Sequence, residues 1–212
     1  MEKRAKKLNE YNFDYLKYTN DLGTDLKIYL PECHIWCNGK GLHGEINNLP
    51  TEEIFTSPEY TKTEGIVYSA KPLFYNGVMI EDFYLKFSKG KVVEYDAKKG
   101  KEMLETILTT DEYSSYLGEC ALVSFDSPIN NTGIIYKETL FDENASCHLA
   151  LGMGFSECNE NALDLERKDL RSIGINDSSI HVDFMIGDET LSVIGVKDDK
   201  ETVIIKNGNI VI

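Results

Sequence analysis

The 212-residue sequence has few basic residues: 22 lysines and arginines stand against 36 aspartates and glutamates, which gives a formal charge of −14. Phosphate contacts need clustered Lys and Arg, so this balance argues against a nucleic-acid-binding protein. It argues equally against electrostatic docking on an anionic membrane. The excess of acids instead suits a soluble protein, a cation-binding protein, or both.

Long hydrophobic runs are also missing from the sequence. No stretch approaches the ~20 apolar residues of a membrane span, and the basic N-terminus has no apolar core of the kind that a secretory signal needs. The cysteines are five in number and irregularly spaced, which does not match a disulfide framework. We therefore expect a reduced, cytoplasmic protein.

The residues that are present favour a folded α+β domain. Hydrophobic residues make up 42% of the chain, with 9 Phe and 12 Tyr, so a sizeable core is expected. Apolar spacing predicts helices over 2–18, 97–109 and 144–151. Alternating or continuous apolar runs predict strands over 24–30, 66–95, 119–125, 180–186, 191–195, 203–205 and 210–212, with a long loop over 156–179. Asn76-Gly77 and Lys89-Gly90 are hairpin turn signals. We expect a mostly antiparallel sheet with a few flanking helices.

The segment around His181 carries the first candidate site. In a strand, residues i and i+2 face the same side, so His181 and Asp183 would project together. An imidazole and a carboxylate that converge in this way form half of a site for a divalent metal. An Asp that orients a His, or a plain surface pair, would show the same spacing.

Three further segments place polar groups among apolar residues. Glu52 and Glu53 lie together in a run bounded by prolines, Glu119 opens an otherwise apolar strand, and His148 is surrounded by small and apolar residues. Each has an ordinary explanation, as a solvated loop acid, an acid at the edge of the core or a hydrogen-bonded core histidine. Together, two histidines (His148 and His181) and three acids match the ligands of a dinuclear hydrolase. The acids Glu53, Glu119 and Asp183 supply −3 against +4 from two ions.

The order of these motifs resembles the thermophilic-type metallo-aminopeptidases, the group that includes aminopeptidase T, aminopeptidase S and PepS. The resemblance runs from Gly23 to about Gly208. It includes the segments Leu49–Thr56, Leu117–Glu119, Thr139–Gly152 and His181–Gly187. By this resemblance residues 1–22 are an N-terminal helix and connector, and residues 23–212 are a catalytic-type domain.

The resemblance implies an exopeptidase that removes N-terminal residues from peptides with two divalent ions, zinc or cobalt. The implied ligands are Glu53, Glu119, His148, His181 and Asp183. Glu52 is the implied general base, although Glu52 and Glu53 could exchange roles. A homodimer is also implied, with no nucleic-acid or membrane partner.

Two departures from the family pattern suggest an alternative. The family has a tyrosine at the metal site seven residues after the histidine that corresponds to His148, and here that substrate-contacting position is Phe155. Family members are also about twice as long, with an additional N-terminal domain. A weakly active or inactive peptide-binding protein on the same scaffold is therefore the alternative.

Two cysteine-based readings remain weaker. Cys147 or Cys158 could act as a nucleophile, but Cys147 and the adjacent His148 would point in different directions on a helix. Cys33-His34 and Cys37 suggest a structural zinc, but only one Cys pair is present.

Overall fold

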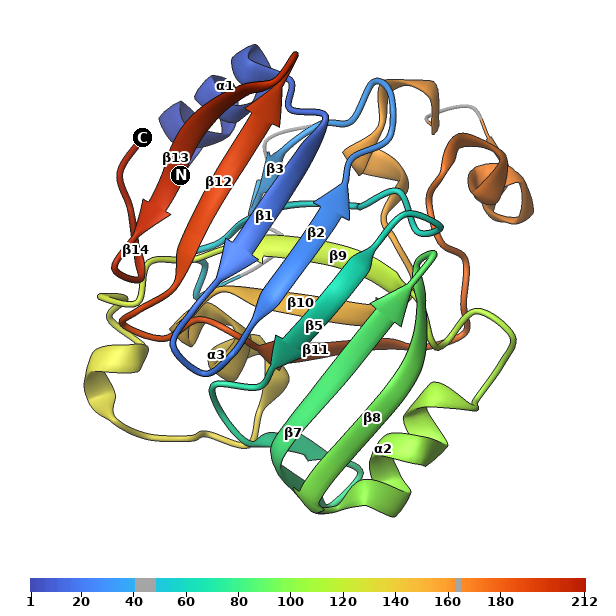
Figure 1. The fold of residues 1–212 in the computed structure, drawn as a ribbon, viewed down its shortest axis with the longest axis vertical. Coiled ribbons are helices and arrows are strands. Elements are labelled where there is room, and N and C mark those ends of the chain that lie inside the picture. Colours follow the sequence, from blue (N-terminus) through green and yellow to red (C-terminus); the bar gives the residue numbers. More distant parts are fainter. Residues whose placement is uncertain (41–48, 163–164) are drawn as a thin grey trace.

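The computed structural model describes residues 1–40, 49–162 and 165–212, which form two antiparallel β-sheets packed face to face (Figure 1). Strands β9, β10 and β11 of the smaller sheet cross behind the larger one (Figure 1). The larger sheet has the order β14 (Asn209–Ile210), β13 (Lys200–Lys206), β12 (Ser192–Lys197), β1 (Tyr15–Thr19), β2 (Asp25–Tyr29), β5 (Glu64–Tyr68), β7 (Val78–Ser88) and β6 (Leu73–Tyr75), with β8 (Lys91–Lys99) also paired to β7. The smaller sheet has the order β11 (His181–Met185), β10 (His148–Gly152), β9 (Leu117–Leu122), β4 (Ile54–Thr56) and β3 (Cys37–Asn38). The expected α+β class with mostly antiparallel strands is confirmed.

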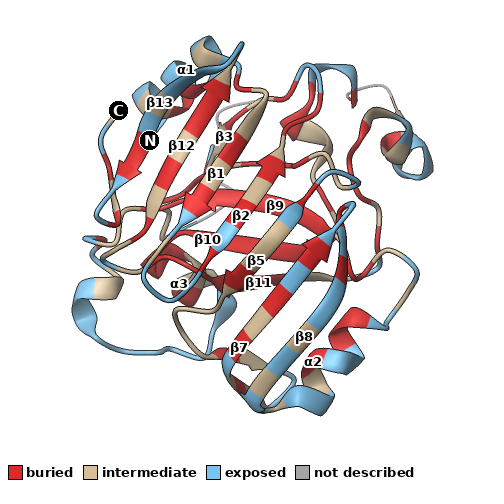
Figure 2. Cartoon of the chain, viewed as in Figure 1, coloured by how far each residue is buried: buried red, intermediate tan, exposed pale blue. Residues whose placement is uncertain are grey.

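Helices lie at the margins of the two sheets. Helix α2 follows β8 and packs its buried side against β7 and β8 (Figure 2). No helix in the described ranges is long and apolar enough to cross a membrane. The α-helices are α1 (Glu2–Tyr11), α2 (Lys101–Leu108) and α3 (Thr139–Asp142), and the 3-10 helices are η1 (Asn130–Thr132), η2 (Glu143–Ala145), η3 (Ser156–Cys158), η4 (Glu160–Ala162) and η5 (Arg167–Ile173).

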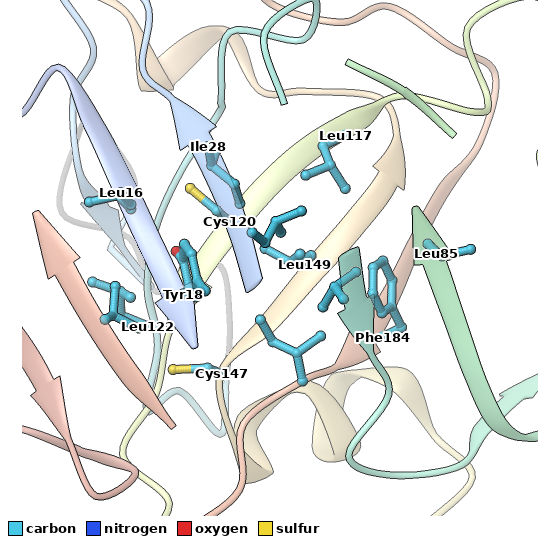
Figure 3. Packing of buried hydrophobic residues seen from close by; sticks show 14 of the residues in the cluster. Leu16, Tyr18, Ile28, Leu85, Leu117, Cys120, Leu122, Cys147, Leu149 and Phe184 are labelled. Atoms are coloured by element: carbon cyan, nitrogen blue, oxygen red, sulfur yellow. The ribbon is translucent and has the colours of Figure 1, made fainter. Parts of the chain in front are cut away.

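The main core fills the space between the two sheets. Leu16 and Tyr18 of β1 and Ile28 of β2 face Cys120 of β9 and Leu149 of β10 (Figure 3). These five side chains are all 0% exposed. Because the core takes only alternate residues of each strand, the intervening residues of β9, β10 and β11 project from the opposite face of the smaller sheet.

The helix expected over residues 2–18 is wrong in its second half. Helix α1 ends at Tyr11, where Asn12 adopts a left-handed conformation with φ of 47°, and Tyr15–Thr19 form β1. Leu16 fits a helical and an alternating pattern equally well, so periodicity did not separate the two. Residues 15–19 pair with β2 on one side and with β12 on the other, and this pairing stabilises the strand over the helix.

The helix expected over residues 144–151 is also wrong, since His148–Gly152 form strand β10. This strand lies between β9 and β11 and is buried along its whole length. A short apolar run bounded by glycine is compatible with a buried helix or a central strand, and only the two neighbouring strands settle which one forms.

The two predicted hairpins are confirmed. Tyr75 pairs with Val78 across Asn76-Gly77, and Ser88 pairs with Lys91 across Lys89-Gly90. The turn residues all have positive φ, 48° and 82° in the first hairpin and 50° and 79° in the second. Two consecutive left-handed residues define the type I′ turn, whose twist matches that of the flanking strands.

The segment that leads into β11 is anchored by one carboxylate. Asp111 accepts hydrogen bonds from the amides of Tyr113 and Ser179 and from the hydroxyls of Ser178 and Ser179. Burial alone would raise the pKa of Asp111, but these hydrogen bonds outweigh it and lower the pKa to about 2. The anchor therefore fixes the start of the strand that carries His181 and Asp183.

We expect Asp111→Asn to lower the free energy of unfolding by about 1 kcal/mol at pH 7, after allowing for solvent screening of this half-buried group. The folded-state pKa lies below the ordinary value of 3.8, so the ionised carboxylate stabilises the fold above about pH 4. The contribution is lost as the pH falls toward 2. Urea unfolding at pH 7 and pH 3 should show the difference between the two proteins shrinking in acid, while the exposed Asp21→Asn serves as control. A difference that grows in acid would contradict this assignment.

Candidate metal centre

The outer face of the smaller sheet gathers the five predicted ligands. Strand register places Ala150 of β10 directly opposite both Glu119 of β9 and Asp183 of β11. The methyl group of Ala150 is the only side chain between the two carboxylates in this row, so space is left above it. His148 lies two residues from Ala150 on the same face, and His181 is paired with Gly152.

Glu119 lies at the centre of this cluster. Its Oε1 is 3.8 Å from Nε2 of His148, and its Oε2 is 3.1 Å from Nε2 of His181. His148 Nε2 is also 3.1 Å from Oε2 of Glu53, and His181 Nε2 is 3.2 Å from Oδ1 of Asp183. The two oxygens of Glu119 therefore serve two different halves of the cluster.

Backbone carbonyls orient both imidazoles. His148 Nδ1 lies 3.3 Å from the Ser146 carbonyl, and His181 Nδ1 lies 2.7 Å from the Met153 carbonyl. A carbonyl can only accept, so each Nδ1 carries the proton and each Nε2 points at the carboxylates. Metal-binding histidines are held in this way, with one nitrogen donating to a backbone or carboxylate oxygen and the other on the metal.

The charges in this cluster are almost completely removed from water. Glu53 and Glu119 are 4% exposed, Asp183 is 5% exposed and His148 is 1% exposed. Burial of one carboxylate is costly without a cation or hydrogen bonds, and three of them in one place multiply that cost. The cluster therefore requires positive charge between its members.

Without a metal ion, that positive charge comes from protons on the histidines. Burial lowers the pKa of His148, but the hydrogen bond and charge of Glu53 and the charges of Glu119 and Asp183 raise it to about 10. Burial likewise opposes protonation of His181, and Asp183 and Glu119 raise its pKa to about 11. Each imidazole thus behaves as a cation held by carboxylates.

The pKa values of two carboxylates, Glu119 and Asp183, are shifted in opposite directions. The pKa of Glu119 is raised, first by burial and also by the charges of Asp183 and Glu53, against the hydrogen bond from His181. Burial also acts to raise the pKa of Asp183, but its hydrogen bond to His181 and the charges of both histidines lower it. Glu119 is therefore the carboxylate that gains most from a bound cation.

The donor set suits two divalent ions. Ligand atoms of Glu53, Glu119 and His148 lie within 4.8 Å of one another, and so do those of Glu119, His181 and Asp183. The two groups share Glu119, as two neighbouring ions bridged by one carboxylate would require. Imidazole and carboxylate ligands are those preferred by zinc and related transition metals.

The two other predicted site residues flank the cluster. Glu52 is half-buried beside Glu53, outside both groups of ligand atoms. The ring of Phe155 packs on His181 with 4.9 Å between centroids, and Phe55 of β4 packs against the same ring at 5.6 Å. The structure thus brings all seven predicted residues to one face of the smaller sheet or its immediate edge.

Sequence reasoning missed Asn144, which is 0% exposed and fixes the segment that carries the two glutamates. Its Oδ1 accepts the Glu52 amide at 2.6 Å, and its Nδ2 donates to the Leu140 carbonyl at 2.9 Å. An asparagine between two acids and a small residue looks like an ordinary helix cap. Asn144 lies four residues before His148, within the segment Thr139–Gly152 that resembles the family, and this position is the signal that could have identified it.

Asn144→Ala should weaken metal binding about tenfold, because loss of a residue that orients a ligand costs about 10–100-fold in affinity. The unpaired Glu52 amide should also lower the free energy of unfolding by about 1–3 kcal/mol. Competition with a fluorescent chelator measures the affinity, and the exposed Asn131→Ala provides the control. An unchanged affinity with lowered stability would limit Asn144 to a structural role.

The cysteine-based readings do not gain support. Cys147 projects toward the core, away from His148, and its Sγ contacts the Val123 amide and carbonyl at 3.3 and 3.2 Å. Burial raises its pKa to about 12, which makes a thiolate nucleophile unfavourable at neutral pH. Cys158 is buried as well, with a pKa raised by the same cause. His34 and its neighbouring cysteines form no metal-binding group within the described part of the chain.

Comparison with known proteins places this geometry in a family. The family model described as thermophilic metalloprotease (M29) matches residues 1–210, so the match begins well before Gly23. Aminopeptidase AmpS of Bacillus subtilis is 42% identical over 214 residues, which cover 99% of this chain and 52% of that protein. Aminopeptidase T of Thermus thermophilus is 42% identical over 196 residues, covering 91% of this chain and 47% of that protein. The chain thus spans about half the length of these curated relatives.

Solved structures give the same assignment. Wild-type AmpT from Thermus thermophilus superimposes with a TM-score of 0.91 at 38% identity, over 100% of this chain and 53% of that chain. A 2,5-dihydroxypyridine dioxygenase from Pseudomonas putida has a TM-score of 0.67 at 14% identity, which shows a shared fold alone. With the fold, the cluster of buried ligands and a match over nearly every residue in agreement, the chain belongs to the M29 family of thermophilic metalloproteases.

Proposed function

We propose that the chain carries a dinuclear metal centre that hydrolyses the first peptide bond of peptide substrates. The observation that carries the proposal is the sharing of Glu119 between two groups of buried ligand atoms. The names of the relatives as aminopeptidases support the substrate class. By the resemblance, the proposal extends to zinc or cobalt as the metal and to a cytoplasmic homodimer.

In this proposal Glu53 and His148 would hold one ion, His181 and Asp183 would hold the other, and Glu119, which belongs to both groups of ligand atoms, would contribute to each. The two ions would supply Lewis acidity toward the scissile carbonyl and toward a water molecule. The Ser146 and Met153 carbonyls accept from both Nδ1 atoms and so keep both Nε2 atoms directed at the carboxylates, where the ions would bind.

Glu52 is the proposed general base. Its backbone is fixed by Asn144, while its side chain stays half-buried beside the ligand Glu53. As general base, the Glu52 carboxylate would take a proton from the attacking water and deliver it to the leaving amine. Phe155 packs on the His181 ring, where it excludes bulk water from the contact between the two rings.

A peptide-binding protein without turnover is the second candidate. Phe155 favours it, because a phenylalanine ring beside His181 has no hydroxyl with which to stabilise an oxyanion. This candidate shares the metal centre and predicts bound peptides that stay intact. Mass spectrometry of peptides incubated with zinc- or cobalt-loaded protein separates the two.

Metal content and thermal unfolding test the proposed centre. We expect about two ions per chain in purified, metal-loaded protein, and unfolding at a lower temperature after chelation. With free metal a thousandfold above its Kd, bound metal should stabilise the fold by about 4 kcal/mol. Elemental analysis and calorimetry provide the two measurements. A chain that retains no zinc or cobalt, with a melting temperature unaffected by chelator, would disprove the proposal.

A further inference from the structure

A hollow of about 330 Å³ opens at the edge of the metal centre, between the end of β10 and the 3-10 helices that follow. Its apolar lining comes from Met153, Phe155, Leu165 and Leu170. The volume lies within the range of small-molecule pockets and is ample for any amino-acid side chain. Nothing in the proposed chemistry at the ions uses this space.

Two residues that line the hollow also contact His181. Phe155 lines it and also packs on the His181 ring at 4.9 Å, and Met153 lines it while its carbonyl accepts from His181 Nδ1 at 2.7 Å. A group seated over the ions would therefore reach the hollow across a single side chain. The hollow thus adjoins His181, one of the proposed ligands, through Phe155 and Met153.

The floor of the hollow is a small hydrophobic cluster of its own. Leu170 is 5% exposed and packs with Ala162 and Ile175, and Leu165 packs against this cluster. The cluster is separate from the main core between the sheets. The segment over 156–179, expected as a long loop, thus contains short 3-10 helices that build a firm apolar wall.

The charges at the rim do not favour an acidic ligand. Arg167 lines the hollow, but its guanidinium is paired with the Asp177 carboxylate and also donates to the Ser178 carbonyl. Glu157 lies on the same rim and adds a negative charge. Among the described lining residues, an acidic side chain would therefore meet no unpaired cation, whereas a neutral apolar side chain would bury its surface.

We propose that this hollow binds the side chain of the substrate's N-terminal residue and selects large apolar side chains such as Leu, Met and Phe. The inference rests on the proposed metal-dependent peptidase function. The carbonyl over the ions belongs to the N-terminal residue, so that residue's side chain starts two bonds from the reacting carbon. Each methylene buried in an apolar pocket improves binding severalfold or more, so Leu should exceed Ala by about tenfold or more.

Calorimetric titration of zinc-loaded protein with amino-acid hydroxamates tests the inference without requiring turnover. Their chelating group binds metal ions and leaves the side chain free to occupy the hollow. L-leucine hydroxamate should bind at least about tenfold more tightly than L-alanine hydroxamate, and L-aspartate hydroxamate should bind more weakly than both. Equal affinities would overturn the inference and leave the metal centre intact. If no hydroxamate binds and no zinc is retained, both proposals fail.

Variants that change the hollow sharpen the test. Ser156→Phe puts a ring into the hollow from its half-buried edge and should reduce the Leu/Ala affinity ratio about tenfold. Leu165→Ala enlarges the hollow and should shift the preference toward L-tryptophan hydroxamate. Ser172→Phe makes the same chemical change at an exposed position outside the hollow and should leave the ratio as in the original protein. A Leu/Ala affinity ratio that is unaffected by both hollow variants would also overturn the inference. Dipeptides give a further test, in which X is the N-terminal residue of X-Ala and the second residue of Ala-X. Selectivity that follows X in Ala-X and not in X-Ala would overturn the inference as well.

Discussion

Glu119→Gln should reduce the metal content from about two ions per chain to less than one and lower kcat/KM at least about a thousandfold. Glu119 is the one residue whose ligand atoms belong to both groups in the cluster, so its loss weakens both sites together. The amide also removes one of the three negative charges that balance two dications. Elemental analysis and peptide hydrolysis at saturating zinc measure the two effects.

The matched control is Glu102→Gln, which changes charge equally on the exposed side of α2. It should keep both ions. The metal-free Glu119→Gln protein should melt no lower than the metal-free original, because Glu119 is a buried carboxylate whose ionised form is disfavoured by burial. Two ions retained by Glu119→Gln would exclude a bridging role for this residue.

Phe155→Tyr should raise kcat by about a hundredfold to a thousandfold, the effect of one added donor to a developing oxyanion. The Phe155 ring already lies against His181, and it is only half-buried, so a hydroxyl can be added without stranding it in the core. Because the donor acts on the transition state, KM should change little. Steady-state kinetics on a leucyl peptide at fixed zinc give both constants.

The control for this gain is Phe141→Tyr, which adds the same hydroxyl to a ring stacked on Tyr136 outside the ligand cluster. It should leave kcat unchanged. If Phe155→Tyr binds two ions and peptide but gains no rate, the phenylalanine is not what limits turnover. The peptide-binding candidate would then be the better description of this chain.

The hairpins and the outer strands could be predicted because their signals are local. Asn76, Gly77 and Gly90 favour their turns because Gly and Asn adopt positive φ more readily than other residues, and Lys89 takes the same conformation beside Gly90. The two segments wrongly predicted as helices have no such local signal. Tyr15–Thr19 and His148–Gly152 are short runs that become strands because other strands pair with them on both sides. For Tyr15–Thr19 one partner, β12, is distant in sequence, and for His148–Gly152 both partners lie about 30 residues away.

For the candidate site, too, the sequence indicated some of the residues, while others depend on contacts between distant segments. His181 and Asp183 could be paired from strand spacing alone, and Glu53, Glu119 and His148 were candidates because of their apolar neighbours. The resemblance to the family supplied their roles and the position of Phe155. Asn144 escaped notice because its role depends on a contact with Glu52, 92 positions away. The hollow lined by Met153 and Leu170 was equally invisible, since no spacing predicts which loops enclose a space.

By itself, the sequence determined the residue types, the alternation and the turns, and hence an antiparallel α+β protein with two histidines and three acids in apolar settings. The tertiary structure decided that Glu119 lies between the other four ligands, across the small side chain of Ala150. Register between β9, β10 and β11 sets that arrangement, and a shift of one residue would turn the ligands of the shifted strand toward the core. Pairing between distant strands is a property of the whole chain, so the centre exists only once both sheets have formed.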